Sequence, residues 1–147
     1  MSTITQALGT RTNLGSLGTL ATGTYLVVGT ITHNTNKPLE VEIEVSATPG
    51  TVSGNKQLAV FAKQSLDGTN FGSGPESGTT TTDEPNLAYL GVLPLNTNST
   101  LQRGVFRLAA AFGGTLPYAT KIIVKNDSGA ALASGSVEFS EVTTTVS

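Results

Sequence analysis

Residues 39–46 read LEVEIEVS and alternate strictly between aliphatic and acidic side chains. The aliphatic positions are Leu39, Val41, Ile43 and Val45, and the acidic positions are Glu40, Glu42 and Glu44. Successive side chains of a β-strand point to opposite faces. The pattern therefore predicts a strand with one face in a hydrophobic core and the other in water.

Six further segments are rich in β-branched and apolar residues. They are 24–31, 57–64, 87–93, 104–112, 119–125 and 136–146. Turn formers separate them, as in NTNKP, TPGTVSGN and NDSGA. This spacing predicts an all-β fold, an antiparallel β-sandwich of the jelly-roll or Ig-like type with about seven or eight strands. Val60, Ile122 and Val124 are expected to share its core with the aliphatic face of 39–46. RLAAAF at 107–112 could form a short helix, but we predict a strand.

The composition agrees with this class. Only 12% of the 147 residues are charged, against about 25% in a typical domain, and the chain has 17 glycines. Long surface helices need Glu, Lys and Arg for propensity and solvation, so a charge-poor chain rich in Thr, Ser and Gly favours strands joined by tight turns. The length fits one domain, which we place at residues 24–147.

Residues 1–23 differ from the rest. Their apolar residues are spaced too irregularly for one helix or strand, and four glycines interrupt them. We predict an extended N-terminal arm that packs on a neighbouring subunit; a disordered tail is the alternative. The predicted contact residues are Ile4, Leu8, Leu14, Leu17 and Leu20. Residues 68–85, GTNFGSGPESGTTTTDEP, predict a long loop with little intrinsic order.

Side chains suited to catalysis or metal binding are scarce. The chain has no Cys and one His, His33, which lies in a polar turn and is expected to be solvated. Asp83 and Glu84 are adjacent in the long loop, which could not hold two carboxylates in a fixed geometry. The turns around Asp67 and Asp127 suit Asx-turns better than calcium, which needs several carboxylates. We predict no enzymatic activity, no cofactor, no metal and no small-molecule substrate.

Charge and hydropathy bear on partners and location. A net charge of −2 with scattered Lys and Arg predicts no nucleic-acid binding. No apolar run approaches the length of a membrane helix, and no secretion signal precedes the domain, so we expect no membrane contact and synthesis in a cytoplasm. The acidic comb at 40, 42 and 44 could bind a cation or a basic partner, but we favour the simpler interpretation that one face of a surface strand must be wet, with like charges that discourage aggregation.

Aromatic residues are few. Tyr25, Tyr89, Tyr118, Phe61, Phe106 and Phe139 lie in or beside predicted strands and are expected in the core. Phe71 alone lies in an open loop. One aromatic side chain does not make a stacking platform for a sugar. A carbohydrate- or receptor-binding module is therefore kept only as the alternative function.

Three stretches between Lys63 and Leu132 carry a resemblance. They are QSLDGTNFGSGP at 64–75, NLAYLGVLPLNTNST at 86–100 and FRLAAAFGGTLPYATKIIVKNDSGAAL at 106–132. The chain resembles small structural proteins encoded among the virion genes of tailed bacteriophages. The resemblance implies a β-sandwich that decorates a capsid or serves as a head-fibre, tail or neck accessory. Its partners would be major capsid or tail and neck subunits and copies of itself, and its location the virion. The shared motifs form turns, so the resemblance implies no catalytic residues.

Overall fold

The computed structural model describes residues 1–147 and is built almost entirely of strands. The strands are β1 (Ile4–Leu8), β2 (Thr12–Ser16), β3 (Tyr25–Thr32), β4 (Glu40–Pro49), β5 (Gln57–Ser65), β6 (Ser77–Gly78), β7 (Ala88–Pro94), β8 (Gln102–Arg107), β9 (Ala119–Asp127) and β10 (Leu132–Val146). The helices are one 3-10 turn, η1 (Glu84–Asn86), and the four-residue α1 (Leu108–Ala111). No helix is long and apolar enough to span a membrane.

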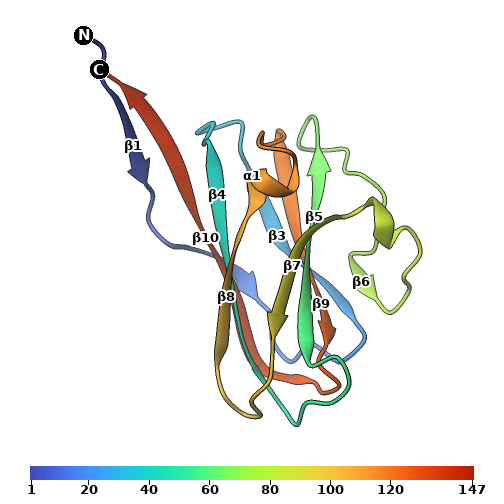
Figure 1. The fold of residues 1–147 in the computed structure, drawn as a ribbon. Coiled ribbons are helices and arrows are strands. Elements are labelled where there is room, and N and C mark those ends of the chain that lie inside the picture. Colours follow the sequence, from blue (N-terminus) through green and yellow to red (C-terminus); the bar gives the residue numbers. More distant parts are fainter.

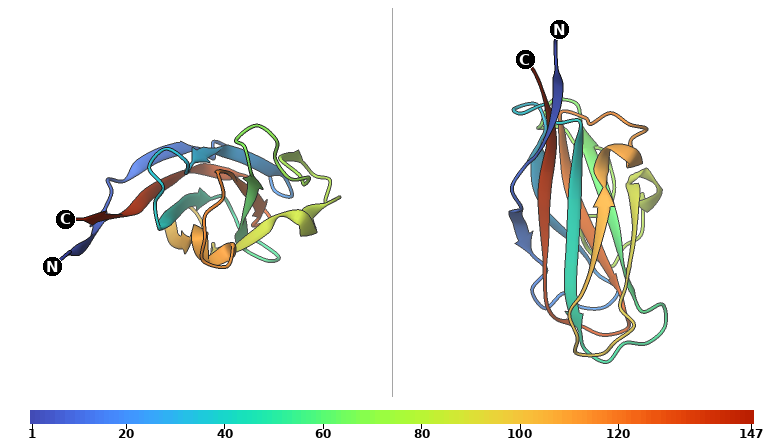
Figure 2. Two further views of the ribbon diagram at one scale, coloured as in Figure 1. Left: turned by 90° about the horizontal axis from the view of Figure 1, so that it is seen from above. Right: turned by 60° about the vertical axis from the view of Figure 1, so that its left-hand side comes forward.

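The strands form two five-stranded sheets that face each other as a sandwich (Figures 1 and 2). The first sheet has the order β1-β10-β4-β8, with β2 also paired to β10. The second has the order β6-β3-β9-β5-β7. Every strand pair is antiparallel. The predicted all-β sandwich is therefore confirmed.

Each of the seven predicted strands has a counterpart. The segment 104–112 divides in two: it is a strand to Arg107 and then a single helical turn over Leu108–Ala111. The prediction of one continuous strand was wrong at that end. Ala-rich sequence favours helix, and Gly113 with φ of +79° ends the turn.

The alternation in 39–46 sets the core. Val41, Ile43 and Val45 are fully buried, and they contact aliphatic residues of β5 and β9 in one cluster of 16 buried side chains. Val60, Ile122 and Val124 belong to the same cluster, as predicted. Leu39 does not, since half of its surface is exposed. It precedes Glu40, the first residue of β4, and so lies just before the chain enters the sheet.

The second sheet is covered on both faces. Its inner side chains meet the first sheet, while Tyr25, Ala59, Phe61, Leu87 and Ile123 form a smaller cluster on its outer face. The segment that follows β5 lies against this outer face through Glu76, and its β6 pairs with β3 at the edge of the sheet (Figure 1). The loop predicted at 68–85 thus contains β6 and the start of η1.

Candidate functional site

The five residues predicted to contact a neighbour fall into two groups. Ile4 and Leu8 on β1 are 71% and 78% exposed. Leu17 is only 2% exposed and belongs to the chain's own core, while Leu14 and Leu20 are partly buried against that core. Leu17 is therefore inaccessible to a neighbour, and only Ile4 and Leu8 are fully presented to one.

Residues 12–20 are part of the sandwich. β2 pairs with β10, and the Leu17 amide donates to the carbonyl oxygen of Gly135 at 2.9 Å. β2 also approaches β3 closely: a Cβ on Gly15 would lie 2.6 Å from the carbonyl oxygen of Val28. Only glycine fits this contact, which helps to hold the two sheets together along this side.

β1 lies apart from the sandwich body. It pairs only with the end of β10, from Ile4 opposite Val146 to Leu8 opposite Val142. We call this two-stranded element, residues 4–8 with 142–146, the ribbon. It projects beyond both sheets (Figures 1 and 2), and all five residues of β1 are exposed.

The ribbon has two different faces. Residues directly opposite each other in an antiparallel pair place their side chains on the same face. Ile4, Leu8, Val142 and Val146 therefore share one face with Gln6 and Thr144. The other face carries Thr5, Ala7, Thr143 and Thr145. The ribbon is amphipathic, and its apolar face is not covered by the chain's own sandwich.

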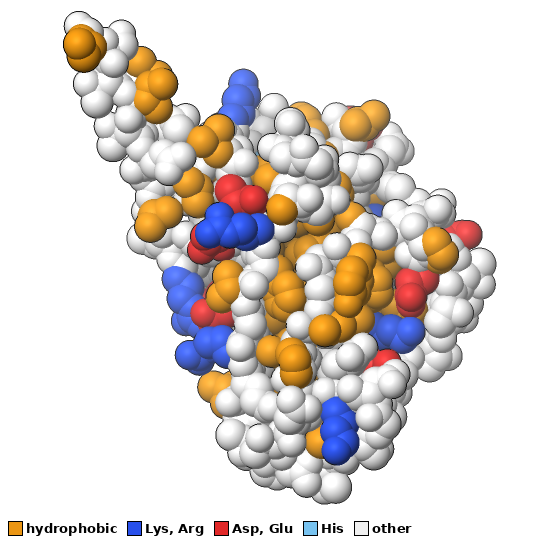
Figure 3. Space-filling view, viewed as in Figure 1, with side chains coloured by type: hydrophobic (Ala, Val, Ile, Leu, Met, Phe, Trp, Pro, Cys, Tyr) orange, Lys and Arg blue, Asp and Glu red, His pale blue; other side chains and the backbone are white.

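The ribbon carries no charged side chain, since none occurs at residues 1–10 or 142–147. Figure 3 shows only hydrophobic and uncharged atoms along the projection. The charged residues of this side of the molecule gather lower down, on the outer face of the first sheet. Uncharged apolar surface on a projecting element is a feature of protein-binding sites.

Two of the three glutamates of β4, Glu42 and Glu44, form ion pairs with arginines. Arg107 binds Glu42 at 3.2 Å, and Arg103 lies 3.5 Å from Glu44. Arg11 binds both Glu44 and Glu138, which face each other across β4 and β10. Glu40 instead accepts the backbone N–H of Ala109. Because all three carboxylates have partners within the chain, the comb offers no free carboxylate to a basic partner. This pairing favours the interpretation of a wet strand face.

The long loop is fastened to the outer face of the second sheet by two carboxylates. Glu76 accepts hydrogen bonds from Lys63 at 2.9 Å and from Lys121 at 3.0 Å. Glu84 accepts hydrogen bonds from Tyr25 and Lys125. Partial burial acts to raise the pKa of Glu76, but the two lysines outweigh it and the pKa is lowered. The prediction of little intrinsic order for residues 68–85 did not anticipate these hydrogen bonds.

Asp67 stabilises the turn at the beginning of this loop. Its Oδ1 accepts the backbone N–H groups of Thr69 and Asn70, both at 2.8 Å. These hydrogen bonds, with a further one from the Asn70 side chain, hold the pKa of Asp67 far below its usual value. Its carboxylate therefore acts as an Asx-turn anchor. No group of three or more His, Cys, Asp or Glu side chains is placed so that it could hold a metal ion.

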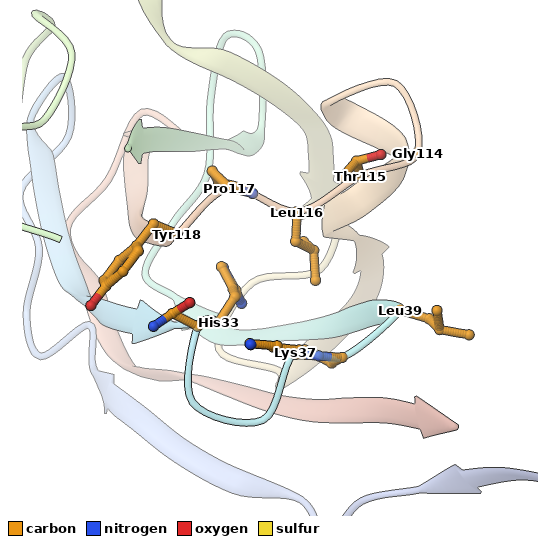
Figure 4. Close-up of a pocket in the computed structure, with 10 residues that line it drawn as sticks. His33, Lys37, Leu39, Gly114, Thr115, Leu116, Pro117 and Tyr118 are labelled. Atoms are coloured by element: carbon orange, nitrogen blue, oxygen red, sulfur yellow. The ribbon is translucent and has the colours of Figure 1, made fainter. Parts of the chain in front are cut away.

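His33 is not solvated, contrary to the prediction. It is 3% exposed, and its Nε2 lies 2.9 Å from Thr120 Oγ1. Burial lowers its pKa, although the charge of Glu141 acts in the opposite direction. Its ring lies beside an open depression of about 500 Å³. Figure 4 shows that the loop 33–39 and the loop 114–118 form its walls.

The aromatic residues were predicted less well than the aliphatic core. Tyr89 is 57% exposed and Tyr118 is partly exposed, although both were expected inside. Phe71, expected in an open loop, is partly buried under the Lys121 amine, which lies 4.5 Å from the ring centre. Tyr118 is the one aromatic residue that lines the depression beside His33.

Sequence reasoning missed half of the ribbon. The end of β10 was predicted as a strand, but not as an exposed partner of β1. A period of two is present in both segments, at Ile4, Gln6 and Leu8 and again at Val142, Thr144 and Val146. This shared period was the available signal, and the glycines at 9, 15 and 18 obscured it when residues 1–23 were taken as one unit.

No family model and no curated protein sequence matches this chain. Among solved structures, a chain of the capsid of Ralstonia phage GP4 is similar, with 13% sequence identity and a TM-score of 0.41. The similarity covers 96% of this chain and 84% of the capsid chain. No residue role is carried over from that capsid, and the fold described above stands on this chain's own strand pairing.

Proposed function

We propose that this chain is a non-enzymatic structural subunit of a bacteriophage virion, a capsid decoration protein or a head or tail accessory that packs on neighbouring subunits. The observation that carries the proposal is the ribbon, a projecting amphipathic element with Ile4 and Leu8 on a bare apolar face. An isolated two-stranded ribbon is marginally stable in water. A neighbouring surface that covers its apolar face would stabilise it.

The energetics favour an assembly of many copies. Burial of apolar surface contributes roughly 25 cal/mol per Å², and ordering the ribbon costs about 1–2 kcal/mol for each residue newly fixed. The net contribution of one short ribbon is therefore small. Contacts of this size give a stable attachment when many copies or several binding sites act together.

The motifs behind the phage resemblance support a structural role. In the structure they form turns: Asp67 caps the turn after β5, and the glycines at 113 and 129 adopt positive φ after α1 and β9. The carboxylates nearby serve as turn anchors and ion-pair partners. We propose major capsid or tail and neck subunits, together with copies of this chain, as partners, and the virion as its location.

The alternative function, a carbohydrate- or receptor-binding module, would need an aromatic-lined groove. The depression beside His33 has Tyr118 as its one aromatic residue, and Tyr89 stands on β7, outside its lining. No specific observation favours that function.

Mass spectrometry of purified phage particles tests the proposal, because a virion subunit must be found in them. The variant test uses the ribbon. Deleting residues 1–20 would remove Leu17 from the core, so the deletion is limited to residues 1–10. We expect this variant to remain folded and to be lost from particles.

A point-substituted pair refines the test. Ile4→Thr with Leu8→Thr removes the apolar face of β1 and places residues of high β-propensity there. Thr5→Ser with Ala7→Ser changes the opposite face of the same strand. We expect the first pair to reduce incorporation into particles and the second to leave it unchanged. Equal incorporation of both would refute a role for the apolar face.

A further inference from the structure

The backbone of β1 has one edge in use and one edge free. Thr3 and Ser147 exchange backbone hydrogen bonds of 2.9 and 3.0 Å, and the Gly9 amide donates to Glu141 at 2.7 Å. Backbone groups alternate between the two edges of a strand. The odd-numbered residues of β1 therefore point to β10, and the N–H and C=O groups of Ile4, Gln6 and Leu8 point outward, unpaired.

This free edge lacks the features that protect edges elsewhere in the molecule. Natural edge strands carry charges, prolines or bulges, or are very short. β8 carries Arg103 and Arg107, β7 ends in Pro94 and has a bulge at Leu90, and β6 has only two residues. β1 has five residues with no charge, proline or bulge.

The three outward residues form a self-complementary set. Pairing β1 with the β1 of a second copy around Gln6 places Ile4 opposite Leu8 of the partner subunit and Gln6 opposite Gln6 of the partner subunit. All three pairs fall at hydrogen-bonded positions of an antiparallel ladder. A two-fold axis through Gln6 then pairs every free N–H and C=O of both strands.

We infer that two copies of this chain associate through the free edges of β1 in a two-fold antiparallel pair centred on Gln6. The product is a continuous four-stranded sheet in the order β10-β1-β1-β10. Its two halves keep the faces of each ribbon, so Ile4 and Val146 of one copy lie beside Leu8 and Val142 of the partner subunit on one face. The absence of charged side chains removes like-charge repulsion between identical strands.

This inference rests on the proposed assembly role in one respect, which is that the ribbon serves to contact a neighbour. It adds the identity of the neighbour, a second copy, and the register. The pairing surface is short, so the dimer should be concentration-dependent. The apolar face of the joined ribbons remains free to lie on a further subunit.

Sedimentation of the purified full chain over a concentration series tests the pairing, with two proline variants as a matched pair. Gln6→Pro removes an outward N–H of β1 that the pairing needs, and leaves the N–H groups that bind β10. Thr144→Pro makes the same change at the residue opposite Gln6, on the outer edge of β10 that the pairing does not use. Proline is tolerated on strand edges whose N–H faces solvent.

We expect wild type and Thr144→Pro to form dimers and Gln6→Pro to be monomeric. Slow amide exchange at Thr5 and Ala7 verifies that β1 stays attached to β10 in the Gln6→Pro variant. A wild-type chain that stays monomeric, an assembly other than a dimer, or a dimer that survives Gln6→Pro overturns the inference.

A cysteine scan reads the register. Hydrogen-bonded antiparallel pairs have Cα atoms about 5.5 Å apart, within the range of a disulfide. Because the chain has no cysteine, Gln6→Cys should give a covalent dimer on mild oxidation. Thr5→Cys should not, since Thr5 would oppose Ala7 of the partner subunit. Equal cross-linking of both variants contradicts the register.

The outcomes for this inference and for the proposed function are separate. A chain present in virions but monomeric in solution refutes the dimer and leaves the structural role in place. A chain that dimerises through Gln6 but is absent from particles refutes the virion role and leaves the pairing in place.

Discussion

Lys63 of β5 is 8% exposed, and its amine donates a 2.9 Å hydrogen bond to Oε1 of Glu76 in the loop above it. The same amine donates to the carbonyl oxygen of Gly74 at 2.9 Å. Lys121 approaches Glu76 from β9. One carboxylate therefore pairs with two lysines on a largely covered sheet face and links the loop to it.

Replacing Glu76 with Gln should release the loop. The variant leaves the buried Lys63 amine without its counter-charge, and the loss of a hydrogen bond to a charged group costs about 1–3 kcal/mol. Urea unfolding measures the free energy, and limited proteolysis between residues 68 and 85 reports the release. Asp83→Asn, the same charge change at an exposed loop position, should be nearly neutral. If both variants resist protease like wild type, Glu76 does not hold the loop.

Stability should fall as the pH drops below the ordinary pKa of histidine. Burial lowers the pKa of His33 from 6.5 in the folded state, so the unfolded chain takes up a proton first and unfolding is favoured. The stabilisation is complete above about pH 6.5 and is lost as the pH falls toward the folded-state value. Urea unfolding of wild type and His33→Gln at about pH 7.5 and about pH 5.5 measures this difference. If the free energy of unfolding changes equally with pH in both proteins, His33 is excluded as the source of the pH dependence.

Glu76 should add a second, more acidic transition. Its pKa is lowered from 4.5 in the folded state, so its contribution is present above that value and is lost as the pH falls below it. Loop proteolysis with an acid-active protease should therefore increase in this range for wild type. Glu76→Gln should show the increase already at neutral pH, and a protected loop there would contradict the assignment.

Ile43 and Leu39 provide a matched test of the core. Both belong to the aliphatic positions of one segment, but Ile43 is fully buried and Leu39 is half exposed. Ile43→Ala should destabilise the protein by about 2–5 kcal/mol, while Leu39→Ala should cost well under about 1 kcal/mol. Chemical denaturation measures both, and equal losses would contradict the observed start of β4.

Gly15→Ala should destabilise the close contact between β2 and β3. Its new methyl group would lie 2.6 Å from the Val28 carbonyl oxygen and 2.9 Å from Val28 Cγ1, so backbone must shift. We expect a loss of about 1–3 kcal/mol and faster amide exchange across residues 12–20. Gly72→Ala is the control, because a Cβ there meets no atom closer than 4.0 Å. An unchanged melting temperature for Gly15→Ala would show that β2 is not held this closely.

The sandwich was predictable because its evidence is local. Alternation in 39–46 placed Val41, Ile43 and Val45 in the core, and turn formers marked the other strands. Leu39 follows the same alternation and still lies half exposed, since a strand's end depends on where its pairing stops.

The candidate site was less predictable because it depends on contacts distant in sequence. Arg11 compensates Glu44 and Glu138, residues from three separate segments. Leu17 and Ile4 are both aliphatic residues of the segment 1–23. Leu17 is nevertheless buried in the core, whereas Ile4 lies exposed on β1, which pairs with β10 beyond the sandwich. His33 follows β3 in a polar stretch of sequence, and the pairing of β3 with β9 brings it to Thr120, a residue 87 positions away, where it is buried.

β10 runs without interruption from the ribbon into the centre of the first sheet, where ten of its residues pair with β4. A pull on the ribbon along its length would load the hydrogen bonds between these strands in parallel, as a shear across the whole ladder. They would not open one after another. Because β10 belongs both to the ribbon and to the core sheet, a subunit tethered through the ribbon would resist mechanical extraction more strongly than its short ribbon suggests.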